Sequence, residues 1–403
     1  MMKRFNTLLL MAALMTGFAA CNDNKDNDND QTATGQLEDL SMNSEWINYA
    51  TATASELLDD CIMLWAAWNG SEGIPAEDLA RIGGSSFFNT SGIGSSGYAQ
   101  KLKTAGQEGN TVFQSQENAV ETVLTDGFAN ISNEVGSAKI GGPNVLAKGG
   151  NKDDAVLEVE SWYSWNSITD YSDNIISIKN GYCGRRGDIS AADNANSIAA
   201  FINSIRPALN DSVNAAINAA YYAIQNMDAP FRSNLTGAKV ETAIDACADL
   251  TEIIEGKLLA TVKAAEHDYT EILRVYADEV VVPTYKALRD RAWSLYNAVN
   301  ALREDPKNQS KLNAACEAWR AARVPWEQSE AILFGPASDD MLGLDPSMDS
   351  WPLSQEDIAL ILQNTNLKTV DQFIGAISGE DVRGFHTLEL LLFKDGENRK
   401  VRN

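Results

Sequence analysis

Hydrophobic residues recur three or four positions apart along most of the chain after about residue 40. In residues 46–68 this spacing forms a broad apolar face that includes Ile47, Leu58 and Trp65. A repeat close to 3.6 residues predicts amphipathic α-helices rather than strands. The same spacing predicts further helices in residues 115–135, 155–181, 190–227, 238–303, 310–334, 354–363, 369–377 and 381–393.

Prolines and glycines indicate where the helical pattern is interrupted. Pro207 lies near the middle of residues 190–227 and Pro283 lies within residues 238–303, where we expect a break and a kink. The Gly/Ser-rich residues 70–111 predict a long loop. Residues 92–97 in this loop fit GxGxxG, but no strand precedes them, so we do not interpret them as a dinucleotide site. Because no run of alternating β-branched residues is long enough for a sheet, the predicted fold class is all-α, built from helical bundles.

The first 21 residues have the features of a targeting segment. Lys3 and Arg4 precede an apolar run that is too short to span a bilayer of about 30 Å. The run ends Phe-Ala-Ala-Cys21, which resembles the bacterial lipobox, with Phe where Leu is usual. We therefore expect Cys21 to be lipidated. Residues 22–40, rich in Asp and Asn, predict a flexible acidic tether, which is either a surface-export signal or a plain spacer.

The composition narrows the classes of partner. The 403 residues include 32 Lys and Arg against 56 Asp and Glu, a net charge of −24. This balance argues against a nucleic-acid partner and favours the attraction of cations. His267 and His386 are the only histidines, so a site with three His ligands is excluded. The cysteines after Cys21 show no CxxC pairing, and we interpret them as small core residues: Cys61, Cys183, Cys247 and Cys316.

The last predicted helix carries the most informative polar pair. His386 and Glu389 are three residues apart and therefore share one face of the helix. Their apolar neighbours indicate a mostly buried helix, in which a carboxylate needs a cationic partner. Imidazole and carboxylate are common ligands of zinc and iron. From the spacing alone, two interpretations stay open: a metal site, or a His386 bonded to a carbonyl with Glu389 paired to an arginine.

Three ordered motifs in the C-terminal part resemble those of one known family. Residues 384–393 resemble the GxHxxE signature of the imelysin-like proteins. Residues 318–336, AWRAARVPWEQSEAILFGP, resemble that family's AW…R-P-[YW]-EQ-E…FGP segment, and residues 350–353 resemble its WPL turn. Three motifs in order over about 80 residues are far more specific than an isolated HxxE.

The other motifs resemble the family in a different order. Residues 46–68 and 160–170 resemble segments that normally follow the GxHxxE helix, whereas here they precede it. The resemblance implies a circularly permuted, two-lobed helical bundle fold with its seam near residues 255–272. Residues 41–255 would form the lobe that resembles the family's second half, and residues 256–403 the lobe that resembles its first half. His267 falls at the seam and is expected to be a surface or packing residue.

The resemblance also implies which residues face one cleft. His386 and Glu389 would be the metal-binding pair. Trp165 stands where the family commonly has Asp, which would remove one carboxylate. If Arg323 paired with Glu389 or Glu330, it would neutralise the site and argue against a metal. The other residues implied to line the cleft are Arg323, Gln328, Glu330, Ser164, Asn166 and Asp170.

The function that the resemblance implies is binding of iron, an iron complex or haem by a lipoprotein of the cell envelope that assists uptake. The metal would be iron or zinc, and further partners would be the outer membrane, through the lipid anchor, and uptake components in it. One alternative is a metallopeptidase, which needs about three metal ligands, an open water position and a general base. Another is a non-metal module that binds a polysaccharide or a surface partner.

Overall fold

The computed structural model describes residues 43–338 and 340–401. The predicted signal peptide, Cys21 and the tether therefore lie outside the described residues. Within the described ranges, none of the helices combines the length and the hydropathy that a membrane crossing requires.

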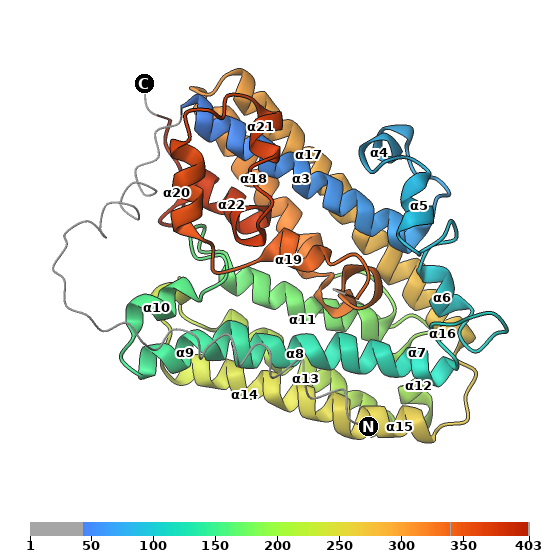
Figure 1. Cartoon of the computed structure of the whole chain (residues 1–403). Coiled ribbons are helices and arrows are strands. Elements are labelled where there is room, and N and C mark those ends of the chain that lie inside the picture. The colour runs from blue at the N-terminus through green and yellow to red at the C-terminus, as the bar shows by residue number, and fades with distance from the viewer. Residues whose placement is uncertain (1–42, 339, 402–403) are drawn as a thin grey trace, which may run out of the picture.

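The helices form two layers, which lie above and below each other in Figure 1. In the upper layer α3 (Ser44–Asn69) packs along α17 (Val282–Glu304), and α17 packs along α18 (Gln309–Glu327). α22 (Gly384–Leu392) contacts both α3 and α18. Shorter helices cover this layer: α19 (Leu344–Asp349), α20 (Gln355–Gln363) and α21 (Val370–Ile374).

The lower layer contains three long helical segments that pack side by side. α11 (Ser167–Cys183) lies against α13 (Pro207–Gln225), and α13 lies against α14 (Ala238–Ile253). α11 also contacts α18 and so joins the two layers. A continuous run completes the layer, in which α-helical and π-helical pieces alternate: α7 (Gln116–Thr122), η1 (Val123–Ala129), α8 (Asn130–Glu134), η2 (Val135–Ile140) and α9 (Gly141–Lys148).

The remaining elements are connecting pieces. The short helices are α4 (Ala76–Arg81), α5 (Ser86–Thr90), α6 (Ala99–Lys103), α10 (Lys152–Leu157), α12 (Ile198–Ile205), α15 (Leu259–Ala264) and α16 (Thr270–Val275). The other π and 3₁₀ pieces are η3 (Phe231–Ser233), η4 (Ile254–Leu258), η5 (Tyr276–Val281), η6 (Glu330–Ile332), η7 (Gly335–Ala337) and η8 (Glu380–Val382). A two-stranded antiparallel hairpin, β1 (Phe393–Lys394) and β2 (Glu397–Asn398), pairs Phe393 with Asn398.

The all-α prediction is confirmed, and the differences are local. Residues 70–111 contain α4, α5 and α6, where we expected a loop. The expected break at Pro207 is confirmed: α12 ends at Ile205 and Pro207 begins α13, because the first turn of a helix needs no N–H from that position. The long pattern 238–303 is divided at residues 265–269, where His267 stacks on Phe201 with ring centres 4.2 Å apart. The four described cysteines are buried and free, as predicted.

Helix α3 is attached to segments more than 300 residues away in the chain. Trp46 donates its indole N–H to the carbonyl of Leu391 (3.1 Å), and Tyr49 donates its hydroxyl to the carbonyl of Val382 (2.6 Å). The division of the chain at residue 255 stays a prediction. The helices α3 and α17 lie on opposite sides of residue 255 in the sequence but pack against each other. The two predicted lobes would therefore share this contact.

Candidate functional site

The start of α22 is placed by a glycine that no other residue could replace without strain. Gly384 has φ +83°, a conformation that side chains rarely adopt, and a Cβ there would lie 2.4 Å from the carbonyl oxygen of Met348. This close approach brings α22 against the end of α19. The residue after Met348 is Asp349, so the glycine of the GxHxxE motif sets Asp349 beside His386.

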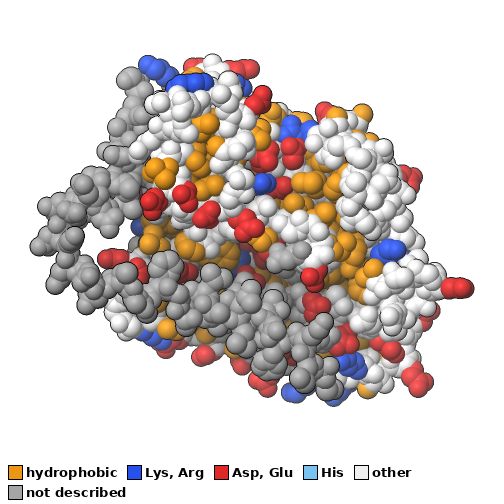
Figure 2. All heavy atoms as spheres, in the orientation of Figure 1, with side chains coloured by type: hydrophobic (Ala, Val, Ile, Leu, Met, Phe, Trp, Pro, Cys, Tyr) orange, Lys and Arg blue, Asp and Glu red, His pale blue; other side chains and the backbone are white. Residues whose placement is uncertain are grey.

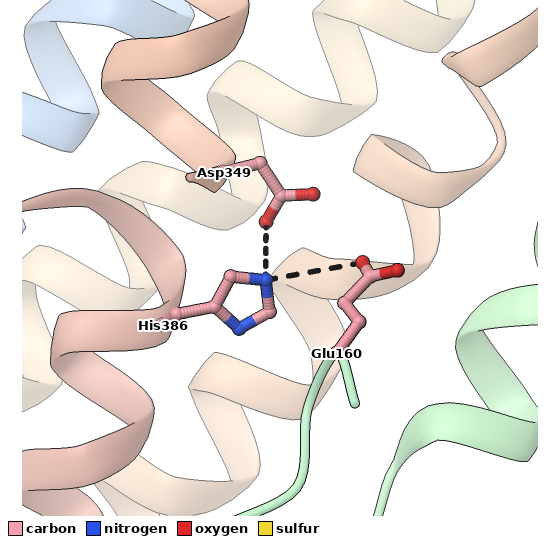
Figure 3. A group of neighbouring side chains, drawn as sticks. All are labelled: Glu160, Asp349 and His386. Atoms are coloured by element: carbon pink, nitrogen blue, oxygen red, sulfur yellow. Dashed lines mark ion pairs between the residues drawn. The ribbon is translucent and has the colours of Figure 1, made fainter. Parts of the chain in front are cut away.

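His386 is buried among three carboxyl groups that come from three separate segments. Its Nδ1 lies 3.1 Å from Glu389 Oε2 on the same helix, and its Nε2 lies 3.1 Å from Asp349 Oδ1. Glu160, from the turn before α11, places Oε1 3.9 Å from the same Nε2. Figure 3 shows Asp349 above this nitrogen and Glu160 to its right, each with a carboxylate oxygen directed at it. Despite these distances, Nε2 makes no hydrogen bond of regular geometry.

Arg323 of α18 is at the centre of the buried cluster. Its guanidinium pairs with Asp349, with Glu160 at 2.6 Å and with Asp170 at 3.3 Å. It also pairs with Glu327 one turn further along its own helix. The guanidinium therefore contacts Glu160 Oε1 and Asp349 Oδ1, the two oxygens that face His386.

Lys139 is the second permanent cation of the cluster. Its ammonium lies 2.9 Å from Glu160 Oε2 and 3.9 Å from Glu330 Oε1, and it is 1% exposed. The indole ring of Trp351 lies 5.0 Å from the same ammonium and 6.1 Å from the His386 ring. Trp351 is half-buried and lines a surface hollow, so it contacts both the cluster and solvent.

The cluster holds more acidic than basic groups. Arg323, Lys139 and a protonated His386 supply three positive charges. Three negative charges would remain if all six buried carboxyls were ionised, and an uncompensated buried charge is costly. The six carboxyl residues, each less than 5% exposed, are Glu160, Asp170, Glu327, Glu330, Asp349 and Glu389.

The pKa shifts indicate which of the buried carboxyl groups stay neutral and so reduce the excess of negative charge. Burial raises the pKa of Asp170 to about 6, and it raises the pKa values of Glu327 and Glu330 well above the usual range. Burial alone would favour the neutral acid at Asp349 too, but Arg323 and His386 hold the pKa of Asp349 well below its usual range. Burial would lower the pKa of His386, yet the Asp349 carboxylate raises it to about 9.

The segment from Ser164 to Asp170, which the resemblance implied would face the HxxE helix, contacts it through Ser164; its role in binding stays a prediction. Ser164 donates both its backbone N–H and its hydroxyl to Glu389 Oε1, each at 2.7 Å. Ser161 and Trp165 on either side have φ values of 54° and 60°, so a strained turn aims these donors. Asn166 donates its amide to Asp170 Oδ1 (2.6 Å), while Asp170 Oδ2 faces Arg323.

The residues predicted from the 318–336 motif separate into two groups. Arg323 and Glu330 lie within the buried cluster, and Arg323 pairs with neither Glu389 nor Glu330 among the ion pairs of the described residues. Gln328 lies apart, where it donates its amide to Asp173 Oδ1 at 2.8 Å. Trp165 is 43% exposed, and its ring packs against Gly396 of the hairpin.

Four residues of the cluster were not assigned a role from the sequence: Lys139, Glu160, Glu327 and Asp349. Glu160 and Glu327 lie inside the family motifs described above, and Asp349 directly precedes the WPL turn. For these three residues, the sequence signal that could have identified them was their position in or next to a motif. Lys139 had none, because an isolated lysine in an amphipathic helix is ordinary.

The residues around His386 Nε2 fit a metal ion in part. Nε2, Glu160 Oε1 and Asp349 Oδ1 all lie within 4.8 Å of one another, and one imidazole with two carboxylates suits iron or zinc. Nε2 makes no hydrogen bond of regular geometry, but the raised pKa of His386 means that the ring would have to lose a proton before it could bind a metal. Against the fit, both oxygens already contact Arg323. A metal ion could enter only if the guanidinium shared these oxygens or withdrew from them.

Comparison with known proteins places this geometry in a family. The sequence model of the imelysin family matches residues 22–256 and 281–403 and leaves the intervening segment unmatched. A crystal structure of an imelysin peptidase from Bacteroides ovatus superposes with a TM-score of 0.77 and 37% identity, over 91% of this chain and 100% of that one. The circular permutation itself stays a prediction.

A curated relative matches a shorter region. Iron-regulated protein A of Synechococcus elongatus is 36% identical over 124 residues, which are 30% of this chain and 31% of that protein. The match thus spans about a third of the relative's length. The family model and the solved structure cover nearly the whole chain, and on these grounds the chain belongs to the imelysin family.

Proposed function

We propose that this protein binds iron, as an ion or within a small complex, at the cluster around His386. The single observation that carries the proposal is the surplus of buried carboxyl groups around an imidazole nitrogen without a regular hydrogen bond. His386, Glu160 and Asp349 would hold the ion, with iron as cargo rather than as a catalyst. The name of the partial relative, Iron-regulated protein A, supports this choice of metal.

Access to this site requires movement at the Ser350–Leu353 turn. A surface hollow of about 520 Å³ is lined by Trp351 and Pro352 on one side and by Gly379 and Asp381 on the other. Trp351 lines this hollow and its ring centre lies 6.1 Å from that of His386, so displacement of the indole would open a route to Nε2.

The test is metal binding by protein that carries no affinity tag. We expect the parent chain to bind one iron ion per molecule in titrations with anaerobic ferrous iron and with ferric citrate, and metal analysis to show the same ratio. His386→Ala and Asp349→Asn should weaken binding by at least about a hundredfold, because loss of a ligand should cost no less than the change of an outer-shell partner. Parallel titrations with zinc establish whether the site binds iron more tightly than zinc.

The chain provides a matched control, because it has one other histidine. His267→Ala, at the break between α15 and α16, should bind iron like the parent. Urea unfolding of each variant separates loss of the site from loss of the fold. If His386→Ala and Asp349→Asn both bind iron like the parent, or if the parent binds none, the proposal is wrong.

A metallopeptidase is the second candidate, favoured by the likeness to a solved imelysin peptidase. One imidazole and two carboxylates would complete a set of three ligands, and Glu389 could serve as the base. However, His386 is 2% exposed and Glu389 is fully buried, so a peptide could not reach them without a large opening. Digestion of unfolded casein that is abolished by a chelator and by Glu389→Ala would establish this activity instead.

We also propose that the protein is a lipoprotein anchored in the outer membrane through Cys21, where it meets the uptake machinery. The support is the sequence pattern around Cys21 and the acidic segment that follows it. Replacement of Cys21 by Ser should move the protein from the membrane fraction to the soluble envelope fraction. An unchanged membrane fraction would contradict lipid anchoring at this residue.

A further inference from the structure

Three residues other than glycine have a left-handed backbone in the described part of the chain, and all three lie at one place. Ser161 and Trp165 have φ values of 54° and 60° in the turn before α11, and Asp395 has φ 52° at the tip of the β1–β2 hairpin. The turn and the hairpin are in contact, because the N–H of Gly396 bonds to the carbonyl of Tyr163 at 2.9 Å. A left-handed backbone strains such residues, and strain of this kind gathers at clamps and switches.

The turn, residues 160–166, which we name the cluster turn, is held at two points by contacts with the buried cluster. Glu160 pairs with Arg323 at 2.6 Å. Ser164 donates twice to Glu389, each time at 2.7 Å. These contacts offset the strain of the closed turn. Because opening the turn would release that strain, it costs less free energy than the loss of the contacts alone.

A cavity of about 370 Å³ beside the cluster turn gives it room to move. Trp162 and Tyr163 of the turn line this cavity together with Leu353 and with Leu390 of α22. Protein interiors are otherwise close-packed, so a segment moves most easily where such space adjoins it. The turn can therefore shift toward the cavity without displacing a helix.

A second covering turn, residues 350–353, is tied to the cluster turn. Its tryptophan donates the indole N–H to the carbonyl of Glu158, two residues before the cluster turn, at 3.2 Å. Glu160 begins the cluster turn and Asp349 directly precedes residues 350–353, so two of the three proposed metal ligands lie at the covering turns. The third belongs to α22. Movement of the turns would therefore separate the ligands from one another.

We propose that the cluster turn is a gate to His386, which opens toward the cavity and takes Glu160 and Ser164 away from the cluster. Opening breaks the pair between Glu160 and Arg323 and lets a small solute reach the imidazole, and closing returns the Glu160 carboxylate to it. The released strain keeps the open state thermally accessible. This inference rests on the proposed function for the identity of the solute, an iron ion, but opening and access are measurable without iron.

Hydrogen–deuterium exchange of metal-free protein, followed by mass spectrometry, measures the opening. We expect the amides of residues 161–166 to exchange together, and faster than those of α18 and α22. Gly396→Ala places a Cβ 2.4 Å from atoms of the Trp165 ring, so it should destabilise the closed turn and speed this exchange about tenfold. Gly109→Ala is the control, because its backbone is also left-handed (φ +86°) but a Cβ there meets no atom within 4 Å.

A matched pair of variants at Trp165 isolates the strain. Trp165→Ala and Trp165→Gly both remove the indole, but only glycine adopts φ 60° without strain. Because strain favours the open turn, residues 161–166 should exchange about tenfold more slowly in Trp165→Gly than in Trp165→Ala.

Carbethoxylation by diethyl pyrocarbonate, which modifies imidazole rings, measures access to His386. Acidic side chains are spread over the face shown in Figure 2 and the net charge is −24, so a neutral reagent is chosen to avoid electrostatic steering. His267 is exposed and serves as the internal reference. In Gly396→Ala, His386 should be modified about tenfold faster than in the parent, with His267 unchanged. Gly109→Ala should match the parent at both histidines.

The rates of iron binding complete the experiment. In a parent that binds iron, Gly396→Ala should take up and release the ion about tenfold faster with an unchanged dissociation constant, because a rarely open gate changes both rates by the same factor. If the parent binds no iron, the proposed function fails, and exchange and carbethoxylation still decide on the gate. The gate is overturned if Gly396→Ala and Gly109→Ala behave alike in either measurement, if Trp165→Gly exchanges as fast as Trp165→Ala, or if Gly396→Ala takes up iron at the parent's rate.

Discussion

Arg323 holds together acids that would otherwise repel one another. It is fully buried and pairs with four carboxyl groups, two of them from segments outside its own bundle layer. Replacement of Arg323 by Met should cost about 3–5 kcal/mol in the free energy of unfolding, because buried acids would be left without a counter-charge. Urea denaturation at pH 7 measures this loss.

Arg320 provides the matched comparison for that measurement. It lies one turn earlier on α18, and its guanidinium packs over the Phe393 ring at the edge of the layer. Arg320→Met should cost at most about 1 kcal/mol, the range of exposed charge contacts. Equal losses in the two variants would mean that the buried ion pairs of Arg323 contribute nothing beyond packing.

Gly384 is expected to be intolerant of any side chain. Gly384→Ala would require a left-handed alanine whose Cβ meets the Met348 carbonyl oxygen, and we expect a loss of about 3 kcal/mol or more. Gly256→Ala is the control, because a Cβ there meets no atom within 4 Å and alanine favours helix. Thermal unfolding compares the two. A Gly384→Ala protein as stable as Gly256→Ala would contradict the described contact.

Much of the site could be predicted from local sequence, and the remainder depends on packing. His386 and Glu389 were found because three-residue spacing puts them on one helical face. Asp349 and Glu160 were not, because they meet His386 only when α19 and the turn before α11 close over α22. Their positions in or next to family motifs marked them as candidates, but helical spacing could not show that they meet His386.

At the scale of the elements, the repeat of hydrophobic residues predicted the long helices but not the short ones. Residues 46–68 were predicted because twenty-odd residues repeat one apolar face, and α3 spans Ser44–Asn69. The helices α4 to α6 have five or six residues each, too few for a period to emerge. The β1–β2 hairpin has two residues per strand and depends on Gly396, whose N–H bonds to Tyr163.

The contact between α3 and the start of α22 should make stability depend on pH. Asp60 of α3 pairs with Arg383 at 2.5 Å, but burial outweighs this pairing and raises the pKa of Asp60 to about 7. The pKa of Asp60 is therefore higher in the folded protein than in the unfolded chain, where it is near 4. The protonated carboxyl contributes its full stabilisation to the fold below pH 4, and this contribution is lost as the pH rises through 7.

We therefore expect the free energy of unfolding to fall between pH 4 and pH 8 by up to ~4 kcal/mol from this one group. Asp60→Asn should flatten that part of the profile and be at least as stable as the parent at pH 8. Denaturant titrations across this range measure the effect. If Asp60→Asn is clearly less stable than the parent at pH 8, the ion pair with Arg383 outweighs the cost of burial.

At the scale of the whole molecule, the two layers are joined by contacts that span the chain. Trp46 and Tyr49 bond to residues near the C-terminus, and Arg323 bonds to Glu160 across the layers. We therefore expect one cooperative thermal transition, with equal calorimetric and van 't Hoff enthalpies. Two separated transitions would show that the layers fold as independent domains.

The position of Arg323 has a consequence for how tightly an incoming ion can be held. Its guanidinium belongs to the same chain as the carboxylate oxygens that a metal would use and is ion-paired with them, so it competes with the metal at a local concentration that dilution does not lower. The net binding free energy of a metal ion is the difference between its own interaction with these oxygens and the interaction of the arginine that it displaces. If iron binds here as we propose, its release would let the guanidinium pair with these oxygens again, which would favour a site that gives up its ion over one that retains it.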